Sequence, residues 1–263
     1  MLIIQPIGGL CNRMRSINSA YMLAKERGEK LKIIWFCNSE LNCPFELLFK
    51  KTADIDVINI RSKWNLRKLW YQFSSTFLGN EDIRANRTEG LLNESFRQSL
   101  GKRLYIATEE HFYPGSDYHL FEPTDAIQER ILALTNSFGA YPVGVHIRRT
   151  DNAPAIGTSS TDAFVESMQA ELLLNPDTIF YVATDDKKEE ENLRNLFPGK
   201  IISNQNRNLS RDSVEGIQDA MLDLYSLAAT HKIIGSFFSS FTDIAADMNG
   251  IPKVIAGSVQ NNI

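Results

Sequence analysis

The sequence predicts an α/β fold made of two Rossmann-like halves, each a mostly parallel sheet flanked by helices, that face one cleft. Short apolar strands alternate with longer helical stretches, and this rhythm occurs twice along the chain. A length of 263 residues accommodates two such halves. We place the boundary after residue 123, which gives an N-terminal domain of residues 1–123 and a C-terminal domain of residues 124–263.

The first half contains four apolar segments with the length and composition of buried parallel strands. A helix is expected between the first two, because apolar residues from Met14 to Ala24 recur at helical spacing and Gly28 follows where a helix would end. Residues 62–100 fit neither pattern clearly. The expected strands are residues 2–5, 31–36, 55–60 and 104–107.

The second half repeats the rhythm more clearly, with helical stretches between its strands. In such a sheet, ligands bind outside the carboxyl ends of the strands, so motifs at strand ends carry the most weight. The expected strands are residues 143–147, 179–183, 200–202, 233–235 and 254–255.

Composition and charge restrict the function. A net charge of -4 and a pI near 5.7 give the chain no general attraction to polyanions, which disfavours a nucleic-acid partner. Any anion site must therefore be local. The first residues contain no basic leader or long apolar run, so we expect a cytoplasmic protein with no integral membrane segment. The odd number and spacing of Cys11, Cys37 and Cys43 favour reduced thiols over a zinc site.

The strongest motif follows the strand at residues 143–147. Alternation along this strand directs His146 and Arg148 to one face at the exit of the strand. Arg148 and Arg149 offer several donors to a diphosphate, and the carboxylate of Asp151, after Thr150, is placed to hold one guanidinium. An ordinary surface ion pair after a strand is the alternative.

A glycine turn follows the first strand. Gly8 and Gly9 open the first helix, so backbone donors and the positive end of the helix dipole meet there, followed by Asn12 and Arg13. Such a turn suits a phosphate. It lacks the third glycine of the dinucleotide fingerprint and the ending of a Walker loop. A tight turn with Asn12 as the helix N-cap is the alternative.

Two carboxylates end the strand at residues 179–183. A metal-binding acidic motif is one interpretation, but Asp186 and Glu189 have the spacing of a capping box before the helix that follows. We therefore expect a structural role for Asp186 and leave Asp185 as the candidate for ligand contact.

A carboxylate and a polar loop mark the later part of the chain. Asp223 lies at the flank of an apolar helical face, where partial burial would demand a guanine edge or an arginine as partner; a solvated carboxylate is the alternative. In the loop after the strand at residues 233–235, Ser239 and Ser240 are candidates to hold phosphate. Asp243 would oppose the anion, and Thr242 is a plausible cap of the next helix.

The segment from Arg61 to Phe73 mixes basic and aromatic residues. We expect an amphipathic helix whose aromatic residues belong to the core, because aromatic stripes at near-helical spacing are usually buried. Contact with a lipid-linked acceptor or with another protein is the alternative.

Taken in order, these motifs resemble the GDP-fucose-dependent fucosyltransferases, with the closest likeness to the alpha-1,6 and nodulation type. The likeness extends from the glycine turn at Gly8 to the Phe238-Ser239-Ser240 loop. The resemblance implies a GT-B-like fold and an inverting, metal-independent transfer of fucose from GDP-fucose to a glycan or polysaccharide precursor, free or lipid-linked. It implies no cofactor besides the GDP-sugar donor, which the C-terminal domain would hold.

The resemblance also implies roles for individual residues. Arg148 would hold the β-phosphate, while Arg149 and Asp151 would order the site, and these three form the expected catalytic set. His146 and Asp223 would meet the guanosine. The expected substrate-binding residues are Gly8, Gly9, Asn12, Arg13, His146, Asp185, Asp223, Ser239, Ser240 and Phe241.

The general base is where the sequence departs from the family pattern. The alpha-1,6 enzymes place a glutamate soon after the arginine motif, whereas this chain continues from Asn152 to Thr161 and ends at Asp162. Asp162 and Asp151 are the candidates. Three alternatives stay open: an alpha-1,2-type or other GDP-sugar transferase, a non-catalytic GDP-sugar-binding protein, and, last, a dinucleotide-dependent oxidoreductase.

Overall fold

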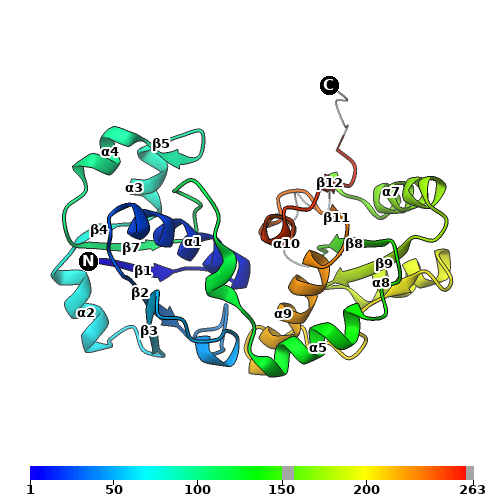
Figure 1. The fold of residues 1–263 in the computed structure, drawn as a ribbon, viewed down its shortest axis with the longest axis horizontal. Helices are drawn as coiled ribbons and strands as arrows, with labels where there is room; N and C mark the ends of the chain where they lie inside the picture. The colour runs from blue at the N-terminus through cyan, green and yellow to red at the C-terminus, as the bar shows by residue number, and fades with distance from the viewer. Residues whose placement is uncertain (150–156, 259–263) are drawn as a thin grey trace. The chain divides into compact units, whose positions relative to one another are not determined.

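The computed structural model describes residues 1–149 and 157–258, so Thr150 and Asp151 of the arginine motif lie outside the described residues. The chain forms two compact units, each with its own five-stranded sheet (Figure 1). Unit 1 contains Met1–Asp125 and Ser210–Gln218, and unit 2 contains Ala126–Leu209 and the chain from Asp219 onward. Ser210–Gln218 is held in unit 1 by bonds such as that from the Asn42 amide to the Arg211 carbonyl (3.0 Å).

Unit 1 is built on a fully parallel sheet in the order β3-β2-β1-β7-β4. The four strands expected from the sequence are present, and the short edge strand β4 comes from the segment that showed no clear pattern. The strands are β1 Leu2–Pro6, β2 Leu31–Phe36, β3 Ile55–Ile60, β4 Thr76–Leu78 and β7 Leu104–Thr108.

The first helix of unit 1 begins about one turn before Asn12, the residue that one interpretation of the sequence took as its N-cap. Helix α1 spans Leu10–Glu26, its N-cap is Gly9, and it buries an apolar face against the sheet. Asn12 is therefore inside the first turn, and the interpretation of Asn12 as N-cap is wrong. Gly28 adopts a left-handed φ of 63° just after the helix, where glycine has no steric penalty.

The segment between β3 and β7 carries several short elements. Helix α2 (Leu66–Phe73) has Asn65 as its N-cap, whose side chain accepts a bond from the Lys68 amide. No residue of α2 is buried. Tyr71 packs against the core of the sheet, but Trp70 and Phe73 are exposed, so the expectation that the aromatic residues belong to the core is wrong for those two. The other elements of unit 1 are η1 Phe45–Leu47, α3 Asn80–Ala85, the antiparallel pair β5 Arg87–Thr88 and β6 Leu91–Leu92, α4 Glu94–Ser99 and η2 Tyr118–Phe121.

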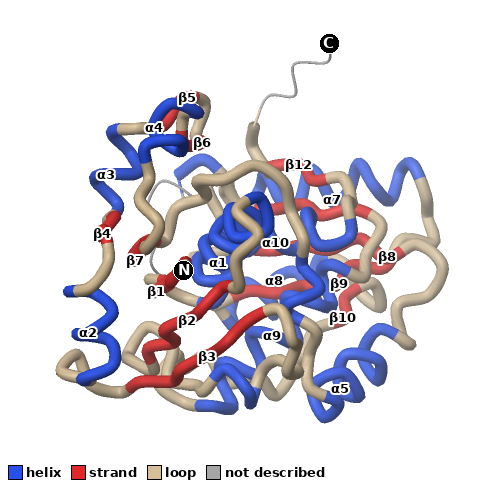
Figure 2. Tube along the Cα trace, turned by 60° about the vertical axis from the view of Figure 1, so that its left-hand side comes forward, coloured by secondary structure: helices blue, strands red, loops and turns tan. Residues whose placement is uncertain are grey.

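Unit 2 contains a second parallel sheet in the order β10-β9-β8-β11-β12, and all five of its strands were expected from the sequence. Figure 2 separates these strands from the helices by colour. The strands are β8 Pro142–Ile147, β9 Ile179–Thr184, β10 Ile201–Ile202, β11 Lys232–Gly235 and β12 Lys253–Ile255. The helices are α5 Asp125–Thr135, α7 Thr161–Leu174, α8 Lys187–Leu196, α9 Val214–Ala228 and α10 Ser240–Asn249. The first residue of α5 and the start of α9, up to Gln218, belong to unit 1.

The central strand β8 is buried on both faces, as a doubly wound sheet requires. Val143, Val145 and Ile147 pack into an apolar cluster with residues of α7 and α8. On the opposite face, a Cβ on Gly144 would lie 2.9 Å from the side chains of Leu227 and Thr230, so the absence of a side chain lets the end of α9 approach the strand.

The order of the strands creates a topological switch point beside β8. The chain passes from β8 through α7 to β9 on one side, and later returns through α9 to β11 on the other side. The connections therefore diverge between β8 and β11. In open α/β sheets, this divergence leaves a crevice at the carboxyl ends of the two strands, which is where ligands bind.

The three cysteines are buried and free, as the sequence predicted. Burial raises the pKa of the Cys43 thiol to about 12. Among the helices of the described ranges, none combines the length and the apolar character that crossing a bilayer requires.

Candidate functional site

Three strands of unit 2 end at the same level. His146 of β8 is in register with Ala183 of β9 on one side and with Gly235 of β11 on the other. The residues that follow, including Arg148 and Ser236, therefore leave the sheet at one edge. This edge includes the switch point between β8 and β11.

His146 connects β8 to α10. Its Nδ1 lies 2.9 Å from the Thr242 hydroxyl and 3.4 Å from the Ser239 hydroxyl, and its ring stacks on Phe241 with centroids 4.8 Å apart. Burial, aided by the nearby charge of Arg148, lowers the pKa of His146 from 6.5 to about 4. The imidazole is therefore neutral at pH 7, and the cation at this edge is Arg148.

Ser236 joins the exits of β8 and β11 and was not singled out from the sequence. Its backbone amide donates to the His146 carbonyl (3.0 Å), and its hydroxyl oxygen accepts from the Arg148 amide (2.9 Å). Ser236 is fully buried, so it fixes the backbone from which the half-buried Arg148 side chain extends. The signal available in the sequence was its position directly after the strand ending at Gly235.

The loop from β11 to α10 is tight and strained. Phe238 has a left-handed φ of 53° and is 81% exposed, although a bulky residue in that region costs about 1–3 kcal/mol. A Cβ on Gly235 would lie 2.2 Å from Thr242 Cγ2, so only glycine permits this close approach. Strain that persists in an exposed loop at a strand end is typical of ligand-binding segments.

The start of α10 differs from the expectation. Ser239, rather than Thr242, is the N-cap, and Thr242 lies inside the first turn, bonded to His146; the assignment of Thr242 as cap is wrong. The Ser239 side chain makes no capping bond, so the first turn keeps donors for an anion. Asp243 in the same turn is paired with Lys253 at 2.5 Å, which offsets the negative charge that would oppose an anion.

Arg149 is held by the protein itself. Its guanidinium donates to Glu189 (2.9 Å) and to the Ser159 carbonyl (2.8 Å), and its backbone amide donates to Asp185 (2.7 Å). These bonds tie β8 to the starts of α7 and α8. We therefore interpret Arg149 as a positioning residue.

The same contacts correct the predicted capping box. Asp186 is the N-cap of α8 and accepts from the Lys188 amide (2.8 Å), as expected. Its expected partner Glu189 does not complete the box. Instead, the Glu189 carboxylate accepts from Arg149 and from the Thr161 hydroxyl (2.7 Å), because a buried guanidinium requires a paired anion.

Asp223 is paired with an arginine. From the sequence we expected either an arginine or a guanine edge as its partner if the carboxylate were buried. The Tyr181 hydroxyl donates to one of its oxygens (2.6 Å), and Arg207 donates to the other (3.3 Å). Arg207 also pairs with Glu190. Burial raises the pKa of Asp223 to about 6, while Arg207 and Tyr181 oppose that rise. Because the protein engages both oxygens, the geometry favours a structural role over a guanosine contact.

The glycine turn of unit 1 lies beside the carboxylate of Glu109. The Asn12 amide donates to the Glu109 carboxylate (3.2 Å), and Glu109 also lies 3.3 Å from where a Cβ of Gly8 would be. The Glu109 carboxylate also lies 3.9 Å from the Arg84 guanidinium, and it places hydrogen-bond acceptors beside the turn. Glu109 is a polar residue that sequence reasoning missed, although it directly follows the strand ending at Thr108.

Arg13 is buried beneath the glycine turn of unit 1. It is 1% exposed, and its guanidinium donates to the Gly8 carbonyl (2.7 Å), the Phe36 carbonyl (2.7 Å) and Asn38 (2.9 Å). Burial lowers the pKa of Arg13 to about 10. These bonds hold the glycine turn against β2, so we interpret Arg13 as a residue that positions the turn.

The remaining acidic candidates are not gathered into a metal site. Within residues 1–149 and 157–258, no three His, Cys, Asp or Glu side chains are grouped so that they could hold a metal ion. Asp162 lies exposed in the first turn of α7. Asp151, the other candidate base, lies outside the described residues.

Comparison with solved structures identifies the fold. The chain is similar to the fucosyltransferase NodZ from Bradyrhizobium (19% identity, TM-score 0.66, covering 93% of this chain and 91% of that one). It is also similar to Arabidopsis thaliana FUT1 in complex with GDP (17%, 0.64, 97% and 69%) and to POFUT1 in complex with GDP (11%, 0.60, 98% of each). The fold is therefore the GT-B-like fold of these fucosyltransferases, as predicted. No family model and no curated protein matches the sequence.

Proposed function

We propose that the protein is an inverting glycosyltransferase that transfers fucose from GDP-fucose to a glycan hydroxyl. The observation that carries this proposal is the convergence of His146, Arg148 and the start of α10 at the β8/β11 switch point of unit 2. The fold adds support, because structures with the same fold contain GDP, and one NodZ structure was soaked with GDP-fucose.

In this proposal, unit 2 binds the nucleotide. Arg148 pairs with the β-phosphate from a backbone fixed by Ser236, and the amides of the first turn of α10 donate to the same diphosphate. His146 is neutral and holds α10 in place through Thr242. Phe241, Ser239 and Ser240 are assigned to closing around the diphosphate.

The chemistry follows from charge. Cleavage of the bond between fucose and phosphate places a negative charge on departing GDP, and a fixed arginine and fixed amides stabilise that charge more in the transition state than in the ground state. The acceptor oxygen attacks the anomeric carbon from the face opposite GDP, and its proton passes to a carboxylate. This account uses no metal ion, so metal independence belongs to the proposal.

We assign acceptor binding to unit 1. Its glycine turn presents the Glu109 carboxylate, which accepts hydrogen bonds from hydroxyl groups, where a phosphate would be repelled. In this proposal Glu109 binds hydroxyl groups of the acceptor, and Asp162 and Asp151 remain the candidates for the general base. A polysaccharide precursor in the cytoplasm is the acceptor class that we propose.

A thermal-shift panel tests the donor assignment. A ligand that binds only the folded state at a hundred times its Kd stabilises that state by about 2.7 kcal/mol. We expect shifts with GDP and GDP-fucose, and none with the UDP, ADP and CMP compounds or with NAD. Equal shifts with UDP would contradict the assignment. Release of GDP from GDP-fucose with an acceptor, undiminished in EDTA, then separates a metal-independent transferase from a non-catalytic binding protein.

A further inference from the structure

Helix α2 presents an apolar stripe to solvent. Leu66, Trp70 and Phe73 are spaced at i, i+4 and i+7, and their side chains are 82%, 56% and 95% exposed. Trp64, just before the helix, is 82% exposed, and Phe77 of β4 is 49% exposed. Large apolar side chains that are exposed singly are common in soluble proteins, but a contiguous stripe marks a surface that binds something.

The same segment is positively charged. Residues 61–80 contain Arg61, Lys63, Arg67 and Lys68 but no Asp or Glu, in a chain whose net charge is -4. Arg103, at the start of β7, adds a guanidinium 5.0 Å from the centre of the Trp70 ring. The surface is therefore a local basic patch on an acidic protein, and its partner must be anionic.

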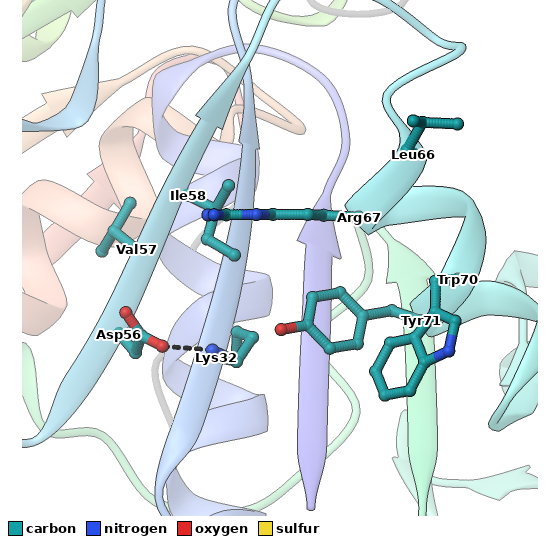
Figure 3. A pocket seen from close by; sticks show the side chains of 8 residues that line it. All are labelled: Lys32, Asp56, Val57, Ile58, Leu66, Arg67, Trp70 and Tyr71. Carbon is teal, nitrogen blue, oxygen red and sulfur yellow. Dashed lines mark hydrogen bonds and ion pairs between the residues drawn. The ribbon is translucent and has the colours of Figure 1, made fainter.

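An open pocket of about 480 Å³ adjoins this stripe, between α2 and the strands β2 and β3. Figure 3 shows the Arg67 side chain extending from α2 toward Ile58 and the Tyr71 ring pointing toward Lys32. Asp56, which also lines the pocket, is bonded to Lys32, so its charge is neutralised. The pocket thus combines apolar walls with the guanidinium of Arg67.

We propose that residues 61–77 form an interfacial element that docks unit 1 on an anionic lipid bilayer. In this proposal, Trp64, Trp70 and Phe73 enter the headgroup region, where amphipathic aromatic rings partition favourably. The flanking lysines and arginines pair with lipid phosphates, and the pocket beside Arg67 accommodates one headgroup. The combination of exposed tryptophans, four cations and no carboxylate favours a bilayer over a protein partner.

The helix is already formed and does not need to fold on the membrane. Asn65 caps its N-terminus, and Tyr71 packs against the apolar core of the sheet that contains Ile3 and Ile34. The exposed stripe can therefore insert while the opposite side of the helix remains attached to unit 1. Membrane docking by this element does not depend on which sugar the protein transfers.

Vesicle sedimentation and tryptophan fluorescence test this proposal. The probes are vesicles of phosphatidylcholine alone and vesicles that also contain phosphatidylglycerol. The chain has three tryptophans, and Trp35 is fully buried with its indole donating to the Cys43 carbonyl (2.7 Å). A blue shift on vesicle addition therefore reports Trp64 and Trp70, both in the proposed element. We expect co-sedimentation and a blue shift with the anionic vesicles, and both decrease at high salt.

Two variants separate the apolar and the electrostatic contributions. Phe73→Ser removes the most exposed ring, and the Lys63→Gln/Arg67→Gln pair removes two charges. Each charge near an anionic surface is worth about fivefold in partitioning, so the pair should weaken binding roughly 25-fold. The matched control is Leu173→Ser/Leu174→Ser on α7, which removes two leucines that are 87% and 80% exposed in unit 2. Phe73, Lys63 and Arg67 are all exposed, so both variants should fold.

Three results would overturn the proposal. The first is no binding to anionic vesicles at low salt. The second is binding that the α7 control weakens as much as Phe73→Ser does. The third is a blue shift that appears without vesicles as protein concentration rises and is lost in Phe73→Ser, because the occupant of the stripe would then be a second copy of the chain.

Discussion

His146 Nδ1 lies 2.9 Å from the Thr242 hydroxyl, so the end of the central strand of unit 2 is bonded to the first turn of α10. This bond fixes a helix N-terminus next to the backbone of Arg148. A strand end and a helix start that are locked together in this way supply preorganised donors for a diphosphate.

Replacing Arg148 should remove the main charge stabilisation of departing GDP. Losing one preorganised donor costs about 2.7–4 kcal/mol in the transition state, so we expect Arg148→Ala to lower kcat/KM for GDP-fucose about a hundredfold or more. Arg148→Lys should recover little, because lysine lacks the planar fork that engages two phosphate oxygens. Steady-state kinetics of both variants measure this. A folded Arg148→Ala protein with near-normal activity would show that the arginine is structural.

His146 should make the protein less stable as pH falls. Its folded pKa of about 4 lies below the ordinary value of 6.5, so between these values the unfolded chain binds a proton that the folded chain does not. Stability from the neutral imidazole is complete above pH 6.5 and declines toward pH 4, by about 3 kcal/mol. In urea unfolding at several pH values, the difference between wild type and His146→Gln should shrink by that amount. A constant difference would mean that His146 titrates normally.

Asp223 should make the protein more stable as pH falls, which is the opposite of the effect of His146. Its folded pKa of about 6 lies above the ordinary value of 3.8, so the folded chain holds a proton in this range that the unfolded chain lacks. Its contribution to stability is complete below pH 3.8 and is lost as pH rises through 6, again by about 3 kcal/mol. Relative to Asp223→Asn, wild type should gain stability on acidification. A gain on going to alkaline pH instead would show that the ion pair with Arg207 dominates over burial.

Gly235 should tolerate no side chain. A Cβ there would lie 2.2 Å from Thr242 Cγ2, so Gly235→Ala must displace α10 from His146. We expect a loss of about 1–3 kcal/mol in the free energy of unfolding, together with weaker GDP binding. The control is Gly157→Ala, where an added Cβ meets nothing within 4 Å. If both alanine variants unfold at the same urea concentration, the close packing of β11 on α10 is not rigid.

The sheet strands could be predicted because their apolar runs are short and are separated by polar or helical stretches. Each of the nine expected strands is present. Alternation along β8 predicted that His146 and Arg148 come together at the exit of the strand, and the structure places His146 at the end of β8 next to Arg148. The edge strand β4 was missed because its three residues, Thr76–Leu78, carry too little pattern. The attachment of Ser210–Gln218 to unit 1 depends on contacts that are remote in sequence, such as that from Gln218 to Leu47.

The site was predicted less completely, for physical reasons that differ between residues. Arg13 has the positive charge that phosphate binding requires. Only the fold shows that its N–H groups already donate to backbone carbonyls of the protein. Glu109 follows a strand without any local motif, and its role depends on Asn12, which is distant in sequence. The aromatic spacing of α2 is the same for a buried and an exposed face, so periodicity alone could not show that Tyr71 packs on the core while Trp70 and Phe73 are exposed.

A calorimetric titration of GDP tests the central claim most directly, because it measures binding at the unit 2 edge without reference to the acceptor. A charge-assisted hydrogen bond contributes about 1.5–3 kcal/mol, so we expect Arg148→Ala to weaken GDP binding about ten- to a hundredfold relative to wild type. The matched control Arg67→Ala, an arginine of the α2 surface in unit 1, should bind GDP as wild type does. Wild-type affinity for GDP in Arg148→Ala, or equal binding of UDP and GDP by wild type, would contradict the account.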